Sequence, residues 1–265
     1  MTTREAFAAG TLYSADTHRL LAQVEAWLEQ GRNQHTDCAP VKALIAPHSG
    51  YFASGNVTAA AYRPLIPQYD QIKRVIIVGA AHKQKIGQIA VPAANTFKTP
   101  LGTVQVDQQS VSDLLAFDQV IESDEHHVAE HSIELQLPFL QTLLEDFSIV
   151  PLVTSQCDFQ YLAEVLDSLW GGPETLIVVS SGLSRHLPLN EATEQDSVTA
   201  AKILTCESTI EDANACGYAA INALLSCAAK HGLAPAQRAL TTSASSGGKS
   251  NRVRGFGAFV FYDKG

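Results

Sequence analysis

The sequence predicts an α/β protein: a single-domain layered sandwich in which helices flank a mixed, largely parallel central sheet. Three observations support this class. Strand-like apolar runs alternate with helical segments along most of the chain, which is the pattern of repeated βα units. Residues 74–82 (RVIIVGAAH) form a near-continuous β-branched run, typical of a sheet covered on both faces. Pro100 and Gly102 predict a turn and a local hairpin, which would make the sheet mixed.

The composition is that of one globular domain spanning residues 1–265. The chain has 265 residues, of which 46% are hydrophobic and 17% charged, and contains no linker or internal repeat that would divide it. Its net charge of -9 offers no basic surface, so we expect no nucleic-acid partner. The sequence shows no bilayer-length apolar run and no secretory leader, so we expect a cytoplasmic protein with no membrane partner.

The first half of the chain begins with an amphipathic helix. We expect it over residues 16–31, because its apolar residues fall on one stripe, with Asp16 as the N-cap and Gly31 as the stop. The next expected elements are a strand at 41–47, a helix at 57–65, the strand at 74–82, and two short strands at 88–93 and 103–107 that form the hairpin.

The second half continues the alternation of helices and strands. The segment 159–170 is amphipathic and separates two apolar runs, as expected for a helix between buried strands. The expected elements are helices at 108–118 and 132–146, a strand at 147–154, the helix at 159–170, a strand at 176–182, helices at 192–204 and 216–232, and a strand at 257–262.

Two histidines follow predicted strands. His48 comes after the strand at 41–47, and His82 ends the strand at 74–82. Ligands bind beyond the carboxyl ends of the strands in open α/β sheets, so the two imidazoles converge if these strands are neighbours. Either histidine alone is better explained as a hydrogen-bonding partner of a loop. Together they suggest a metal site, because neutral imidazole suits iron, copper, zinc and nickel.

A third group of candidate residues begins the helix expected at 132–146. Glu130, His131 and Glu134 crowd its start, and His131 and Glu134 share one face if both are helical. The same residues also satisfy ordinary capping and the preference for acidic residues in a first helical turn. The spacing therefore leaves a structural and a functional interpretation open.

Cys216 begins the helix expected at 216–232. A helix N-terminus favours the thiolate, which is a better ligand or nucleophile than a buried thiol, although Cys216 is equally a small apolar residue that packs a helix. The five cysteines have no short paired spacing, which argues against a disulfide framework and a zinc ribbon.

Several blocks of sequence, taken in order, resemble those of one family. They are GTLYSAD, APHSGY, VGAAH, FKTPLGTVQVD, EHSIELQLPFL, VSSGLS and CGYAAINALL. They resemble the Memo family, whose bacterial members are called component B of the AmmeMemoRadiSam system, and the likeness runs over nearly the whole chain. This resemblance implies a fold similar to that of class III extradiol dioxygenases, which are non-haem iron enzymes that cleave catechol rings.

The resemblance also implies roles for particular residues. The family's cluster corresponds to His48, His82 and Cys216 as metal ligands, with His131 lining the same pocket. His131 and Cys216 are then the catalytic candidates. A cysteine in place of the dioxygenase carboxylate makes a softer site, which favours a divalent metal, with iron first and copper or zinc as alternatives, over magnesium. The residues expected to bind substrate are Tyr51, Glu134 and His186.

One block departs from the family pattern. Where the family commonly has S-S-D-x-S-H, this chain has Gly182 and Arg185 in place of the aspartate and the histidine. Glycine cannot orient an imidazole, and arginine cannot act as a base at neutral pH. We therefore expect any proton transfer at this corner to be lost, unless His186 substitutes.

These observations lead to one main hypothesis and two alternatives. We predict a metal-dependent redox enzyme with a dioxygenase-like cleft, a substrate of unknown identity and Tyr51 hydrogen-bonded to that substrate. The first alternative is a non-catalytic module that binds a peptide or protein in the same cleft. The second is a metal-free enzyme with Cys216 as nucleophile and His131 or His82 as its base. The resemblance further implies a functional link to radical SAM and AMMECR-type proteins.

Overall fold

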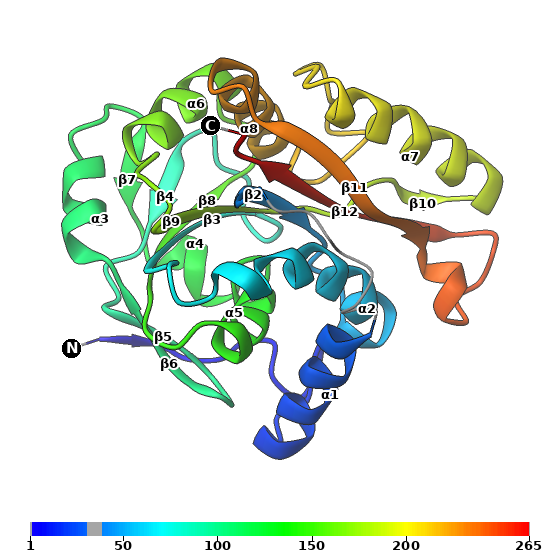
Figure 1. Ribbon diagram of the computed structural model, residues 1–265, viewed down its shortest axis with the longest axis horizontal. Helices are drawn as coiled ribbons and strands as arrows, with labels where there is room; N and C mark the ends of the chain where they lie inside the picture. Colours follow the sequence, from blue (N-terminus) through cyan, green and yellow to red (C-terminus); the bar gives the residue numbers. More distant parts are fainter. Residues whose placement is uncertain (1, 31–38, 265) are drawn as a thin grey trace.

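The computed structural model describes residues 2–30 and 39–264 (Figure 1). Its strands are β1 (Thr3–Arg4), β2 (Val41–Ala46), β3 (Arg74–Ala80), β4 (Ile89–Val91), β5 (Thr96–Thr99), β6 (Gly102–Val106), β7 (Val120–Glu122), β8 (Ser148–Thr154), β9 (Thr175–Ser180), β10 (Arg185–Leu187), β11 (Ala234–Thr242) and β12 (Val253–Tyr262). They form one sheet in the order β1-β5-β6-β8-β3-β9-β2-β12-β10, with β11 paired to β12, and β4 paired to β7 and β8.

The central strands β8, β3, β9 and β2 run parallel to one another, and β12 runs antiparallel to β2. Their side chains are almost all buried, because strands rich in valine, isoleucine and leucine are covered on both faces. The predicted α/β class with a mixed, largely parallel sheet is confirmed.

Helices cover the two faces of the sheet. They are α1 (Thr17–Glu29), α2 (Tyr51–Tyr62), α3 (Gln108–Leu114), α4 (Glu125–Val128), α5 (Leu137–Leu143), α6 (Phe159–Ser168), α7 (Leu189–Leu204) and α8 (Tyr218–Lys230), with 3-10 turns η2 (Arg63–Gln68), η3 (Glu134–Gln136) and η4 (Ser243–Ser246). In Figure 1, α1, α2 and α5 lie below the sheet, whereas α6, α7 and α8 lie above it. None of the helices in the described ranges is long and apolar enough to cross a membrane.

The predicted hairpin exists, but one of its strands was assigned wrongly. The turn joins β5 to β6, with Thr99 opposite Gly102, so the turn at Pro100 is confirmed. The expected partner strand at 88–93 instead contains β4, which pairs with β7 and β8. This pairing joins segments far apart in the chain, which local turn signals cannot reveal.

The helices differ from prediction mainly at their ends. Asp16 caps α1 as expected by accepting a hydrogen bond from the Arg19 amide at 2.7 Å, whereas the expected stop, Gly31, lies outside the described residues. The second helix begins earlier than predicted, at Tyr51. Its first turns contain Gly55, which weakens a helix on its own but here lets the chain approach Trp27 closely.

The segment expected as one helix over 132–146 contains η3 followed by α5. Pro138 stands in the first turn of α5, where its missing amide hydrogen leaves no helical bond unmade. Only seven residues of this segment, Leu137–Leu143, are α-helical. His131 and Glu134 therefore do not share an α-helical face, because η3 begins only at Glu134.

The order of strands explains how the candidate residues come together. β9 lies between β2 and β3, and both Ala46 and Gly79 stand opposite Ser180. The strands that precede His48 and His82 are therefore not direct neighbours. Their carboxyl ends nevertheless open at the same edge of the sheet, on either side of β9.

Candidate metal centre

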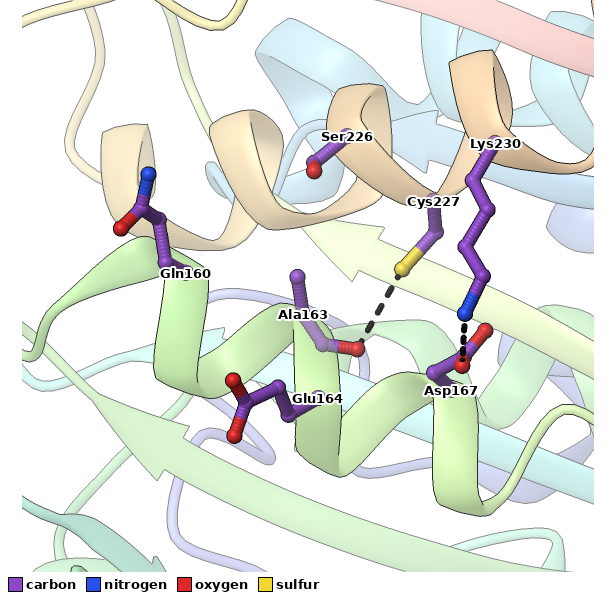
Figure 2. Close-up of a pocket in the computed structure, with 7 residues that line it drawn as sticks. All are labelled: Gln160, Ala163, Glu164, Asp167, Ser226, Cys227 and Lys230. Carbon is purple, nitrogen blue, oxygen red and sulfur yellow. Dashed lines mark hydrogen bonds and ion pairs between the residues drawn. The ribbon is translucent and has the colours of Figure 1, made fainter.

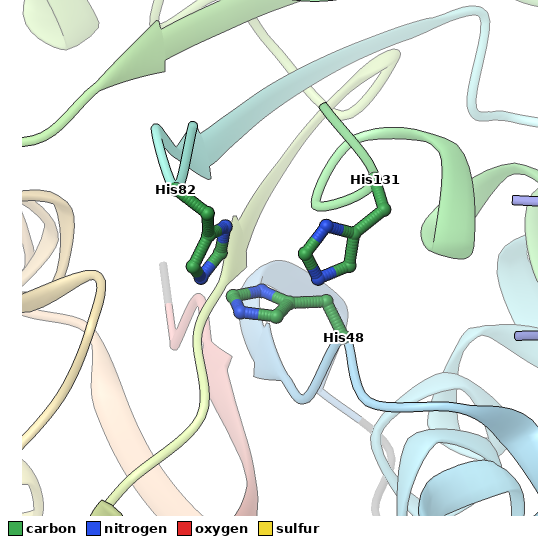
Figure 3. A group of neighbouring side chains, drawn as sticks. All are labelled: His48, His82 and His131. Carbon is green, nitrogen blue, oxygen red and sulfur yellow. The ribbon is translucent and has the colours of Figure 1, made fainter. Parts of the chain in front are cut away.

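Three imidazoles meet at this edge of the sheet (Figure 3). His48 follows β2, His82 follows β3, and His131 lies between α4 and η3. One ligand nitrogen of each ring lies within 4.8 Å of the other two, and the ring centroids of His82 and His131 are 4.7 Å apart. His48 is buried, His131 is half-buried, and His82 is the most exposed of the three. This group of histidines could hold a metal ion.

Glu130 orients two of the three rings. Its carboxylate accepts hydrogen bonds from the backbone amides of His82, His131 and Ser132 at 2.7, 2.8 and 2.9 Å. One carboxylate oxygen also lies 3.0 Å from Nδ1 of His82 and 3.2 Å from Nδ1 of His131. We assign the Nδ1 protons to these contacts, which direct the Nε2 atoms toward the shared centre, as carboxylate partners of metal-binding histidines do.

His48 is oriented by a separate hydrogen-bond network. The Ser180 hydroxyl donates to the Ser132 carbonyl at 2.6 Å and accepts from Nε2 of Gln136 at 2.8 Å. Because its only proton is used, Ser180 can only accept from His48 Nδ1, which lies 3.0 Å away. Nδ1 of His48 therefore carries a proton, which leaves Nε2 to bind a metal or to take up the proton of the neighbouring Cys216 thiol.

Cys216 lies against His48, just before α8. Its Sγ is 3.3 Å from His48 Nε2 and accepts a hydrogen bond from the Gly182 amide at 3.2 Å. Burial alone would raise the pKa of this thiol, but the charge of His48 and hydrogen bonds with His48 and His82 hold the pKa well below its usual range. The structure thus favours a thiolate through two imidazoles and an amide, whereas we had predicted this effect from the helix N-terminus.

The charges of the other groups follow from these contacts. Burial opposes protonation of His82, but hydrogen bonds to Cys216 and Glu130 raise the pKa of His82 to about 10. Burial and the charge of His48 lower the pKa of His131 to about 4. Without metal, His82 is therefore protonated between two anions and His131 is neutral. A metal ion that bound here would displace the proton from His82.

A cavity of about 570 Å³ opens above these residues. Its walls include five of the seven residues given a ligand, catalytic or substrate-binding role from the sequence: His48, His82, His131, His186 and Cys216. Phe7 and Leu12 of the N-terminal segment form another part of the wall; Leu12 lies in the block GTLYSAD, but neither residue was assigned a role from the sequence. Glu130 was noticed only as part of an acidic helix start, although a carboxylate directly before a candidate histidine is a signal that could have identified it.

Tyr51 and Glu134 do not line this cavity. Tyr51 is buried, and its hydroxyl donates to the Leu135 carbonyl at 2.7 Å. Glu134 is fully buried, and its carboxylate pairs with Arg4 and accepts hydrogen bonds from the Phe7 and Ala8 amides, both at 2.9 Å. These contacts fasten the N-terminal segment to the core, so the Glu134 carboxylate faces this segment and not the cavity.

The departure at residues 182–185 changes the cavity wall. A side chain built on Gly182 would place its Cβ 3.7 Å from Cys216 Sγ, so this position faces the thiol. Arg185 forms an ion pair with Asp212 at 2.9 Å and lines the cavity mouth. His186 is exposed at the same mouth, but no hydrogen bond joins it to the histidine group among the described residues. The structure therefore offers no evidence that His186 replaces the missing base.

Another pocket lies between α6 and α8 and lacks such a constellation (Figure 2). Its Cys227 is buried, and its thiol donates to the Ala163 carbonyl at 3.4 Å. Burial raises the pKa of Cys227 to about 11, so its thiol stays protonated at neutral pH. Lys230 and Asp167 pair with each other at 2.5 Å across the rim. These contacts hold two helices together and provide no activated group.

Comparison with known proteins assigns the chain to a family. The family model described as Memo-like protein matches residues 4–255. A MEMO1 family protein of Metallosphaera sedula is 32% identical over 83% of this chain and 83% of its own length, and one of Sulfolobus acidocaldarius is 30% identical over 96% and 98%. Protein MEMO1 of Xenopus laevis is 34% identical over 67% of this chain and 61% of its own length. The chain therefore belongs to the Memo-like protein family.

Proposed function

We propose that this protein is a metal-dependent redox enzyme whose metal is bound at the carboxyl edge of the sheet by His48 and His82, with His131 and Cys216 completing the site. One observation carries the proposal: three imidazoles converge within 4.8 Å while their Nδ1 atoms face Glu130 and Ser180. Such outer partners are typical of metal-binding histidines, since they set the tautomer and the ring orientation.

The donor set fits a divalent transition metal. Imidazole nitrogen and thiolate sulfur are softer than carboxylate oxygen, so they favour iron(II), copper or zinc over magnesium or calcium. Iron is our first choice, because the proposed relation to class III extradiol dioxygenases would give it an analogous site at the same edge of the sheet. Any of these metals, when bound, would supply a Lewis acid for an oxygen-bearing substrate, and iron or copper would also supply a redox couple.

The protein's own residues would position the reactants and move protons. His131 is neutral and faces the cavity, so its Nε2 can complete the metal's donors or, where the other three donors hold the metal, accept a proton from a substrate hydroxyl. Glu130 would keep His131 and His82 in place during this transfer, because its carboxylate holds the backbone amides of both. Phe7 and Leu12 would limit access of water from the side of the N-terminal segment.

Elemental analysis of protein purified and reconstituted without oxygen tests the metal site. We expect about one metal ion per chain, and a reduced metal content in each of the variants His48→Ala, His82→Ala, His131→Ala and Cys216→Ser, because every one of them removes one of four converging donors. The exposed His18 on α1 provides the matched control, His18→Ala. A His48→Ala variant with a full complement of metal would refute the proposed ligand set.

A metal-free thiol enzyme is the second candidate, favoured by the distance of 3.3 Å between Cys216 Sγ and His48 Nε2. The base would then be His48, whereas the sequence suggested His131 or His82. This candidate predicts that Cys216 of metal-free protein is alkylated at neutral pH much faster than free cysteine, and that His48→Ala abolishes the difference. Turnover that persists in Cys216→Ser would rule it out.

A further inference from the structure

The described part of the cavity wall carries several positive side chains, and the Cys216 thiolate is the only negative group among them. Lys83, Arg185 and Arg254 line it together with four histidines, and no aspartate or glutamate is among the lining residues. The chain as a whole has a net charge of -9, so the charge of the cavity wall is opposite in sign to that of the whole chain. Glu130 lies behind the histidines, where its carboxylate faces their backbone amides.

The two arginines face each other across a pair of strands. Arg185 on β10 stands opposite Arg254 on β12 in antiparallel register. Like charges directly opposite each other on adjacent strands destabilise a sheet. Arg185 is partly compensated by Asp212, whereas the Arg254 side chain makes no hydrogen bond or ion pair with any residue that the structure describes. This unfavourable arrangement is what a bound anion would relieve.

An irregular backbone points consecutive side chains into the cavity. The register of β10 with β12 shifts between Arg185 and Leu187, and the residue between them, His186, has a φ of +62°. A non-glycine residue in the left-handed region is uncommon, and strand irregularities of this kind occur beside functional sites, where they redirect a side chain. In a regular strand Arg185 and His186 would point to opposite faces, but here both line the cavity.

We propose that Arg185 and Arg254 form an anion-binding subsite at the cavity mouth, which holds a carboxylate or phosphate group of a small-molecule substrate. The paired guanidinium groups suit either anion, because both offer oxygens for bidentate hydrogen bonds. Phe7 and Leu12, which line the same cavity, would contact the apolar part of the same molecule. This inference rests on the proposed function only in taking the cavity as the substrate site.

A pair of alkylating reagents tests the subsite on the metal-free, full-length chain. Iodoacetate and iodoacetamide have the same reactive carbon, but only iodoacetate is an anion. We measure the alkylation rate of Cys216 by peptide mass spectrometry, and take the ratio of the iodoacetate rate to the iodoacetamide rate. Attraction by the two arginines should make this ratio about tenfold higher at Cys216 than at glutathione.

The variants locate the source of that preference. In Arg254→Gln, Arg185→Gln and the double variant, the ratio should fall toward that of glutathione, while the iodoacetamide rate stays unchanged. Lys73→Gln is the matched control, because it removes one exposed positive charge at the amino end of β3, the opposite edge of the sheet. A ratio equal to that of glutathione in the wild type, or one that the arginine variants leave unchanged, overturns the proposal.

Competition experiments identify the anion. Phenyl phosphate, benzoate and the neutral benzyl alcohol are tested for protection of Cys216 from iodoacetamide. Protection by phenyl phosphate or benzoate that exceeds that by benzyl alcohol and is lost in Arg254→Gln supports a phosphate or a carboxylate, respectively. Equal protection by all three overturns the proposal.

If Cys216 reacts with neither reagent, the binding of phenyl phosphate and of benzoate is measured directly by calorimetry. Binding of either anion that weakens at least tenfold in the double variant supports the subsite, and absent or unchanged binding of both overturns it. None of these measurements requires metal. A protein that binds no metal but prefers anionic to neutral ligands refutes the proposed metal site and not the anion subsite. A protein that binds metal but shows no preference for anions refutes the anion subsite and not the metal site.

Discussion

Replacing Glu134 by glutamine distinguishes a structural role of this residue from the substrate-binding role that its position in the sequence suggested. The Glu134 side chain is 0% exposed and that of its partner Arg4 is 2% exposed. Its two oxygens accept hydrogen bonds from Arg4, from the Phe7 and Ala8 amides at 2.9 Å, and from the Tyr13 hydroxyl at 2.5 Å. Glutamine keeps one of the two oxygens but replaces the other with an NH2 group. That NH2 group would face N–H or O–H groups that also donate, so their hydrogen bonds would be lost.

The expected cost follows from the buried charge. Removing one partner of a buried ion pair typically costs about 3–5 kcal/mol, because the other charge is left uncompensated. Arg4 keeps hydrogen bonds to three backbone carbonyls, those of Glu5, His127 and Glu130. We therefore expect the lower end, about 3 kcal/mol, which corresponds to a fall in Tm of about 6–12 °C for a chain of this size.

The free energy of unfolding is measured by urea denaturation followed by circular dichroism at pH 7. Glu164→Gln, an exposed position on α6, is the matched control and should lie within about 0.5 kcal/mol of the wild type. The double variant Arg4→Met/Glu134→Gln should cost less than the sum of its single variants, because it leaves no buried charge unpaired. A Glu134→Gln variant as stable as the wild type, but with weakened ligand binding, would refute the structural role.

Three further predictions concern packing, pH and metal affinity. Gly55→Ala should destabilise the protein by about 1–3 kcal/mol in the same urea assay, because its Cβ would lie 2.5 Å from the Trp27 ring, whereas Gly87→Ala, with nothing within 4 Å, should be tolerated. Burial lowers the pKa of His127 to about 4 and leaves its Nδ1 without a partner among the described residues, while the unfolded chain has a pKa of about 6.5. The unfolded state thus binds more protons than the folded state between these two pKa values. The contribution of His127 to the free energy of unfolding is therefore fully present above pH 6.5, and about 3 kcal/mol of it is lost as the pH falls to 4. His127→Gln should flatten the pH dependence of unfolding in this window, and an unchanged slope would contradict the assignment. Glu130→Gln should weaken metal binding by about 10–100-fold in competition with a chelator while the chain stays folded, and undiminished affinity would exclude Glu130 as the residue that orients the ligands.

Most elements of the fold were predictable because their signals are local. The strands β2, β3, β8 and β9 are continuous apolar runs, and α6 and α1 are amphipathic segments with an aspartate cap. Elements that depend on distant partners were missed. Residues 234–242 contain a proline and polar residues, yet they form β11 because they pair with β12 along nearly their whole length. α2 also includes Gly55, a residue that disfavours a helix locally but here lies close to the ring of the distant Trp27.

The candidate site was predictable in its members but not in their contacts. His48, His82 and Cys216 could be named because histidines at strand ends and a cysteine beside a helix start are chemically distinctive, and because the surrounding blocks resemble one family. The same signals could not show that Glu134 faces inward, since a carboxylate at a helix start looks alike whether it binds a ligand or the chain itself. They also could not show that Arg185 and Arg254 stand opposite each other.

The sequence by itself determined the fold class, the family and the side chains that are candidates for a site, because apolar periodicity, turn residues and ordered blocks are properties of neighbouring residues. Only the tertiary structure decided which of these side chains meet. β9 inserts between β2 and β3, so His48 and His82 approach each other over the end of a third strand, and His131 reaches them from a segment more than forty residues farther along the chain. Such encounters depend on strand order and on the hydrogen bonds of Glu130 and Ser180, which minimise the free energy of the whole chain and leave no trace in the local pattern.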